Sequence, residues 1–272
     1  MCGIVGYIGP RPVLPILIGG LKKLEYRGYD SAGCAVVTPD NTMLVFKAKG
    51  KVSNLEEKAK ECRQTCTLGI AHTRWATHGI PSETNAHPHL SQSGNLAIVH
   101  NGIIENYATL RDQLRKRGYT FKSETDTEVL VQLIEYIMNI RHSDLATSVR
   151  SALRLCIGAY AIAVVDRRVP TQMVAARKSS PLAIGIGKEN GEFFIASDAS
   201  PIAEYTNRIV YLNDEDVALI EQGKELQIEN LHSGSVDYEI KEVDLDLTML
   251  DKGGFPHFML KEIFDQPTVL KD

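Results

Sequence analysis

The 272-residue chain lacks the long apolar and basic segments that are typical of membrane proteins and nucleic-acid-binding proteins. No apolar run approaches the roughly 18 residues that a spanning helix needs, and no basic-apolar-small leader opens the sequence. No tract of five basic residues occurs, and 30 basic residues against 34 acidic ones leave a formal charge of −4. We therefore expect no binding to nucleic acid or to a membrane.

Cysteine is scarce as well. The five thiols are odd in number and scattered, which fits free cysteines in a reducing cytoplasm better than a disulfide framework. Five of the eight histidines lie between residues 72 and 100, but no C-x₂-C pair or H-E-x-x-H spacing accompanies them. Gly185-x-Gly187 lacks the third glycine of a dinucleotide fingerprint. Neither a metal site nor a cofactor is expected.

The apolar periodicity predicts a layered α+β domain. Helical spacing is expected over 13–26, 52–62, 106–117, 126–139 and 144–155, and Thr125 with Glu128 forms a capping-box pattern before the fourth of these. Strands are expected over 3–6, 34–37, 43–47, 68–75, 96–99, 159–166, 173–176, 182–186, 193–197, 209–212, 217–220, 226–229 and 238–243. Residues 76–95 form an expected long loop, a feature that is uncommon in compact domains and often functional. Strands, then helices, then strands predict two packed sheets with helices outside.

The C-terminal segment changes character near Leu250, where Asp251-Lys252-Gly253-Gly254 resembles a linker. We therefore predict one domain over residues 1–245. Residues 246–272 are interpreted as a linker and the start of a further domain that is missing from the chain.

Cys2 is a candidate nucleophile. A thiol attacks as thiolate and needs a nearby base. If Met1 is removed, the α-amino group of Cys2 supplies one, because such amines titrate near 7.7–8.0 in model peptides. Gly3 and Gly6 would allow close approach of a ligand or a second backbone. The alternative is a buried first strand in which the cysteine is simply a small apolar residue.

Three other clusters could complete such a site. Asn101-Gly102 could aim two donors at a developing oxyanion, or could be an ordinary hairpin turn. Arg74 could hold a carboxylate through its guanidinium fork beside Trp75, or could lie on the surface. Asp126 could hold an ammonium group, or could be a helix-start aspartate that the dipole favours.

Together these clusters resemble the glutaminase half of the glutamine–fructose-6-phosphate aminotransferases, which are class II glutamine amidotransferases. The resemblance covers about residues 2–245 and returns at 257–263. It is carried by five collinear motifs, at residues 2–6, 26–33 (Tyr-Arg-Gly-Tyr-Asp-Ser-Ala-Gly), 73–79 (Thr-Arg-Trp-Ala-Thr-His-Gly), 100–102 and 123–128.

The resemblance implies a four-layer αββα sandwich of the N-terminal-nucleophile hydrolase type. It implies that Cys2 attacks the side-chain amide of L-glutamine, that its own amine moves the protons, and that Asn101 and the Gly102 N–H form the oxyanion hole. It further implies that Arg74 binds the α-carboxylate and Asp126 the α-ammonium. The remaining implied residues are Trp75, Thr77 and His78, which bind substrate within a lid over 75–82, and Arg27, which supports the site.

The resemblance also implies a homodimer in the full-length protein, and ammonia delivered to fructose 6-phosphate by the missing sugar-isomerase domain. Alone, residues 1–272 would run only the glutaminase half-reaction. Three alternatives stay open: a class II amidotransferase with another acceptor, an N-terminal cysteine hydrolase of bile-salt-like or penicillin-like amides, and a domain that senses an amino acid without turnover.

Overall fold

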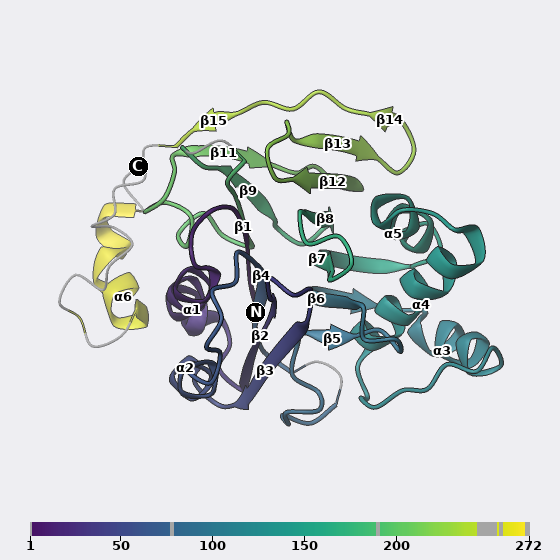
Figure 1. Cartoon of the computed structure of the whole chain (residues 1–272). Helices are drawn as coiled ribbons and strands as arrows, with labels where there is room; N and C mark the ends of the chain where they lie inside the picture. Colours follow the sequence, from purple (N-terminus) through teal and green to yellow (C-terminus); the bar gives the residue numbers. More distant parts are fainter. Residues whose placement is uncertain (1, 77–78, 189–190, 244–254, 256–257, 270–272) are drawn as a thin grey trace.

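The computed structural model describes residues 2–76, 79–188, 191–243, 255 and 258–269. Two antiparallel sheets face each other, and helices cover the outer face of each (Figure 1). The predicted four-layer α+β sandwich is confirmed. The boundary that we predicted between residues 245 and 246 lies outside the described residues.

The first sheet has eight strands in the order β15-β11-β9-β10-β1-β4-β2-β3. Their bounds are β1 Gly3–Ile8, β2 Ser31–Val37, β3 Met43–Lys49, β4 Leu68–Arg74, β9 Ala183–Ile186, β10 Phe193–Ala196, β11 Arg208–Tyr211 and β15 Lys241–Glu242. The N-terminal strand β1 is central, because it pairs with β10 on one side and with β4 on the other. The end of the chain that carries Cys2 is thereby anchored in the middle of a sheet.

The second sheet has seven strands in the order β14-β13-β12-β8-β7-β6-β5. Their bounds are β5 His89–Leu90, β6 Leu96–Ile104, β7 Gly158–Asp166, β8 Gln172–Lys178, β12 Asp216–Glu221, β13 Gln227–Asn230 and β14 Gly234–Ser235. Strands β6 and β7 stay in register from Leu96 opposite Asp166 to Ile104 opposite Gly158. This long ladder fixes where Asn101 and Gly102 lie.

The helices are divided between the two outer faces (Figure 1). The helix α1 (Val13–Leu24), the short 3₁₀ turn η1 (Glu25–Arg27) and α2 (Val52–Ala59) accompany the first sheet. The helices α3 (Tyr107–Arg115), α4 (Asp126–Arg141) and α5 (Leu145–Leu153) accompany the second, and α6 spans Phe258–Val269. No helix among the described residues is long and apolar enough to cross a membrane.

The core between the sheets combines branched and small side chains. Ile4 and Ile70 of the first sheet belong to the same buried cluster as Ala97, Ala161 and Ala163 of the second. Alternate residues of each strand point outward to the helices, as the period of two along a strand requires. Alanines on one inner face allow the two sheets to approach closely, which brings strand ends from both sheets together.

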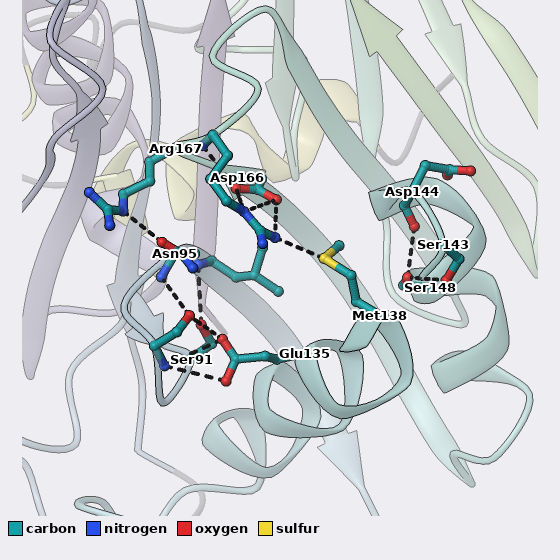
Figure 2. Close-up of polar contacts among 12 residues, drawn as sticks. Ser91, Asn95, Glu135, Met138, Ser143, Asp144, Ser148, Asp166 and Arg167 are labelled. Carbon is teal, nitrogen blue, oxygen red and sulfur yellow. Dashed lines mark hydrogen bonds and ion pairs between the residues drawn. The ribbon is translucent and has the colours of Figure 1, made fainter. Parts of the chain in front are cut away.

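A polar network fixes the end of the second sheet that is far from Cys2 (Figure 2). The Arg167 Nε donates to Asn95 Oδ1 at 2.8 Å, and the Ser93 N–H donates to the Glu135 carboxylate at 3.3 Å. Arg168 forms an ion pair with the nearly buried Asp166 at 2.7 Å. These bonds join the start of β6 to the end of β7 and to α4, and so help to hold the ladder in register.

Several boundaries differ from the sequence prediction. Within the expected strand over 238–243, only β15 (Lys241–Glu242) is a strand. The two-residue strands β5 and β14 were not predicted. Strands this short carry no detectable alternation of polar and apolar residues. Asn41, with φ 59°, lies in the turn before β3.

The capping box at α4 is only half formed. The Glu128 N–H donates to Thr125 Oγ1 at 3.2 Å, as predicted. However, the Glu128 carboxylate accepts from the N–H groups of Lys122 and Ser123 rather than from that of Thr125. Glu128 therefore ties the loop before α4 to the helix.

Candidate active site

The predicted site residues that the structure describes come together from β1, β4, β6 and α4. Cys2 precedes β1, Arg74 ends β4, Asn101 and Gly102 lie on β6, and Asp126 begins α4. Gly3 pairs with Thr73, so Cys2 and Arg74 are near neighbours across the β1–β4 ladder. One small cavity is lined by Cys2, Arg74, Trp75, His87, His100, Gly102, Thr125, Asp126 and Thr127.

The Cys2 thiol is half-buried and lies against the backbone of Trp75. The Trp75 N–H donates to Cys2 Sγ at 3.2 Å, and Sγ lies 3.5 Å from the Trp75 carbonyl oxygen. Burial raises the pKa of the Cys2 thiol, although the Trp75 N–H and the Arg74 guanidinium act in the opposite direction. A thiol in this setting is protonated near neutral pH, so it can act as a nucleophile only with a base beside it.

Of the two expectations for Gly3, close approach of a ligand or of a second backbone, the structure shows close packing of the protein itself. A Cβ at Gly3 would lie 2.7 Å from Thr73 Oγ1 and 2.8 Å from the Leu24 Cβ. The missing side chain lets α1 and β4 close over β1. This packing fixes the backbone of the neighbouring Cys2.

Asn101 and Gly102 are not a hairpin turn and do not follow the end of the strand. Both lie inside β6, opposite Ala161 and Tyr160 of β7. The Asn101 Nδ2 donates to the Cys2 carbonyl oxygen at 3.1 Å, and Asn101 Oδ1 lies 2.9 Å from His72 Nε2. An amide donor is thus held directly beside the nucleophile candidate.

Gly102 is a glycine for a physical reason. Its φ is +133°, and a Cβ there would lie 2.1 Å from the Ala159 carbonyl oxygen. No other residue can occupy this position without moving β7. The local backbone therefore has an orientation that an ordinary strand residue would not adopt.

Arg74 is buried, with only 3% of its surface exposed, so the surface alternative is wrong. Its Nη2 donates to the Gly79 carbonyl oxygen at 3.2 Å. A buried guanidinium that lines a cavity is well suited to bind a carboxylate in two-point fashion.

The loop after Arg74 is held by the stretch over residues 26–33. The Asp30 N–H donates to the Arg74 carbonyl oxygen at 3.2 Å, and the Asp30 carboxylate accepts a bond from the Ala76 N–H. A Cβ at Gly28 would lie 3.0 Å from the Arg74 carbonyl group. The sequence did not reveal this role of Gly28 and Asp30, although a polar turn between two glycines was visible.

Trp75 is 53% exposed, and its ring meets the Tyr29 ring edge-on, with centroids 6.2 Å apart. Its backbone contacts the Cys2 thiol. Thr77 and His78 lie outside the described residues, as does the side chain of Arg27.

Asp126 is buried in the first turn of α4, with 4% of its surface exposed. One carboxylate oxygen accepts from the Ile104 N–H at 2.8 Å and the other from the Thr127 N–H at 3.0 Å. The carboxylate is fixed by the backbone of β6 and of its own helix. It faces the same cavity as Arg74, so opposite charges lie on the walls of one small space.

Four histidines near this cavity are buried. His87 and His100 line it, His72 contacts Asn101, and His89 contacts Thr125. The rings of His72 and His87 lie 4.2 Å apart. Burial lowers the pKa of His72 to about 3 and lowers those of His87 and His89 well below the usual value. These three rings are therefore neutral near pH 7. Among the residues that the structure describes, no group of three His, Cys, Asp or Glu side chains could hold a metal ion.

The comparisons with known proteins agree with this geometry. Residues 72–204 match the family described as "Glutamine amidotransferase domain". The whole chain is 58% identical over 272 residues to a glutamine–fructose-6-phosphate aminotransferase [isomerizing] of Bacteroides thetaiotaomicron and covers 44% of that relative. A protein of the same name from Chlorobaculum tepidum is 52% identical over 276 residues, again with 100% of this chain and 44% of the relative covered.

Solved structures share the fold. A glutamine phosphoribosylpyrophosphate amidotransferase from B. subtilis is 24% identical with a TM-score of 0.72, over 86% of this chain and 50% of that one. A structure titled as the allosteric regulatory enzyme of purine biosynthesis is 26% identical with a TM-score of 0.71, over 85% of this chain and 49% of that one.

Proposed function

The chain belongs to the glutamine amidotransferase family, and from that premise we propose that it hydrolyses the side-chain amide of L-glutamine through a cysteinyl thioester. One observation carries this proposal. Cys2, Gly102 and the opposite charges of Arg74 and Asp126 line a single cavity, and the Asn101 amide donates to the backbone of Cys2. An amino-acid amide substrate needs a nucleophile, an oxyanion donor and a partner for each of its charges.

In the proposed reaction, Cys2 Sγ attacks the glutamine amide carbon, ammonia leaves, and water then hydrolyses the thioester to glutamate. The second hydrogen of Asn101 Nδ2 and the N–H of Gly102 would hold the oxyanion. The first hydrogen of Nδ2 bonds to the Cys2 carbonyl oxygen, so the amide is already held beside the thiol. Loss of one such donor typically slows a reaction by about 10²- to 10³-fold.

The proposed base is the α-amino group of Cys2, exposed by removal of Met1. Burial keeps the thiol protonated by raising its pKa. The side-chain alternatives are His78, which lies outside the described residues, and His100, whose Nδ1 is 2.9 Å from Thr127 Oγ1. An amine on the same residue as the thiol can take its proton and pass it to the departing ammonia.

Arg74 is proposed to bind the α-carboxylate of glutamine, and Asp126 its α-ammonium. Both are buried, so water screens their charges weakly. We propose that Trp75, Thr77 and His78 border the bound substrate within a lid over residues 75–82, and that Arg27 supports the stretch beneath it.

The chain spans less than half the length of the curated relatives that it matches. We propose that in the full-length protein the ammonia goes to fructose 6-phosphate, through a sugar-isomerase domain that follows the glutaminase domain over residues 1–245. We also expect this full-length protein to be a cytoplasmic homodimer. Identities of 58% and 52% to aminotransferases of that name favour this acceptor over a phosphoribosyl one.

Two preparations test the proposal, one starting at Cys2 and one that keeps Met1, each verified by mass. Glutamate release from glutamine should be observed for the first. It should be slower by about 10²- to 10⁴-fold for the second, the usual contribution of general acid–base catalysis. If neither preparation released glutamate, the glutaminase proposal would be refuted. Equal rates in the two preparations would show that a side chain, and not the α-amino group, is the base. Residues 1–272 prepared alone should give no amino sugar from fructose 6-phosphate, since we propose that a following isomerase domain binds that acceptor.

A further inference from the structure

We propose that His72 is a positioning residue: its Nε2–H holds the Asn101 amide in the orientation that directs an N–H donor towards the reacting amide of the substrate. The inference rests on the proposed function. It concerns a fully buried histidine that makes no contact with the Cys2 thiol in the described structure.

The bond partners of Asn101 determine which way its amide faces. The Cys2 carbonyl oxygen can only accept a hydrogen bond, so the Asn101 atom 3.1 Å from it is the nitrogen Nδ2. Asn101 Oδ1 therefore faces the other partner, His72 Nε2, at 2.9 Å. Because Oδ1 can only accept, the hydrogen of this bond belongs to His72 Nε2.

The environment of His72 favours this single tautomer. Burial lowers the pKa of His72 to about 3, so the ring carries one hydrogen at neutral pH. The other ring nitrogen, Nδ1, is buried, and Nε2 is the nitrogen that faces Asn101 Oδ1. Asn101 is thus the acceptor that places the hydrogen on Nε2.

The bond also crosses between the two sheets. His72 lies on β4, opposite Ile4 of β1, whereas Asn101 lies on β6 of the second sheet. Without the His72 donor, the amide would keep only its bond to Cys2. A flipped amide would then direct Oδ1, an acceptor, at a developing negative charge.

The test compares His72→Leu, which has no donor, with His72→Gln, whose amide nitrogen can reach the position of Nε2. We expect His72→Leu to lower kcat for glutamine about 10²-fold, the lower range for an oxyanion donor, with KM little changed. His72→Gln should recover most of that loss. Alkylation of Cys2 by iodoacetamide, which needs no oxyanion donor, should proceed at the wild-type rate in both variants.

A double variant separates positioning from general damage. Adding His72→Leu to Asn101→Ala should slow turnover no further than Asn101→Ala alone, because both changes remove the same donor. Additive losses would overturn the inference, as would full activity of His72→Leu. If His72→Leu does not fold, nitrogen-15 NMR of the wild-type protein decides, since a hydrogen on Nδ1 of His72 would refute the tautomer. A wild-type protein without glutaminase activity would instead refute the proposed function.

A separate observation concerns Cys62 and Cys66, and we infer that they form a reversible disulfide. Their Sγ atoms lie 4.0 Å apart in the turn between α2 and β4, and both face the Gln64 carbonyl oxygen, at 3.5 Å and 3.7 Å. A disulfide needs the sulfurs about 2.05 Å apart, so the side chains must close by about 2 Å. The segment between them has no helix or strand to resist that movement.

Exposure determines which thiol reacts first. Cys62 is partly exposed, whereas Cys66 is buried, and burial raises the pKa of Cys66 to about 12. Hydrogen peroxide would oxidise the Cys62 thiolate to a sulfenic acid with loss of hydroxide, which becomes water. Cys66 then attacks Cys62 Sγ, the S–S bond forms, and a second water leaves.

The test is peptide mapping after peroxide treatment, with free thiols alkylated and no reductant added. Trypsin cuts after Lys60, Arg63 and Arg74. Peptides 61–63 and 64–74 should therefore appear linked, or appear as 61–74 uncut and lighter by two hydrogens, until a reductant is added. Cys66→Ser should give a Cys62 sulfenic acid that dimedone traps, and Cys156→Ser should behave as wild type. Two alkylated thiols after peroxide, or a bridge from either cysteine to Cys34, would refute the inference.

Discussion

Asp126→Asn separates the two tasks that the structure gives to this carboxylate. Each oxygen of Asp126 accepts one backbone N–H, from Ile104 at 2.8 Å and from Thr127 at 3.0 Å. An asparagine has only one acceptor oxygen, so either rotamer leaves its NH₂ facing a buried backbone donor. An unsatisfied buried donor costs about 1–3 kcal/mol of unfolding free energy.

The charge lost in Asp126→Asn affects binding separately. A hydrogen bond to a charged group contributes about 1.5–3 kcal/mol. At about 1.4 kcal/mol per factor of ten, KM for glutamine should rise by about 10- to 150-fold. Urea denaturation measures the first effect and steady-state kinetics the second.

A substrate that lacks the α-amino group isolates the proposed contact. For glutaramate, 4-carbamoylbutanoate, Asp126→Asn should differ little from wild type, because there is no ammonium to bind. Asp112→Asn is a matched control, since Asp112 lies on α3 with its side chain 70% exposed. Equal losses for glutamine and glutaramate would show that Asp126 serves only the fold.

Three further outcomes are expected. Arg74→Lys keeps the charge but loses the two-point guanidinium contact, so KM for glutamine should rise at least about tenfold. The rate of Cys2 alkylation should stay unchanged. An unaltered KM would refute the proposal that Arg74 binds the α-carboxylate. Thr125→Ala removes the acceptor for the Glu128 N–H and should cost about 1 kcal/mol, seen as a Tm lower by about 2–4 °C. His72 has a folded pKa of about 3 against about 6.5 unfolded, so the unfolded state binds more protons as pH falls from about 6.5 to 3. Unfolding free energy should therefore fall there by up to about 1.4 kcal/mol per pH unit from His72 alone, and an unchanged urea midpoint between pH 7 and pH 5.5 would contradict its neutrality.

The sequence predicted the layers because long elements carry strong periodic patterns. The helix α1 places its apolar residues at the helical period over twelve residues, so its type is unambiguous. The pairing order could not be predicted. In the first sheet β1 lies between β10 and β4, and about 190 residues of sequence separate β1 from β10. Such non-local pairing depends on the whole core rather than on any local pattern.

The site was predicted in its charged and nucleophilic members, but not in what holds them. Cys2, Arg74 and Asp126 were singled out because the motifs that contain them resemble those of the class II amidotransferases. His72 and Asp30 were not, because a histidine inside an apolar strand and an aspartate in a turn are ordinary by sequence. Their importance arises only from the partners that folding brings within about 3 Å.

Asn101-Gly102 shows why local rules fail at such a site. An Asn-Gly pair is the strongest short-range signal for a hairpin turn, yet here both residues lie within β6 and pair with β7. Gly102 has a positive φ, as in a turn, but the tertiary structure supplies the cause, since the Ala159 carbonyl oxygen occupies the place of a Cβ. The backbone departs from regular strand geometry beside Cys2, where we propose that its N–H binds an oxyanion. At a functional position, a residue's conformation is expected to differ from its local preference, because the fold holds it in the geometry that the reaction needs.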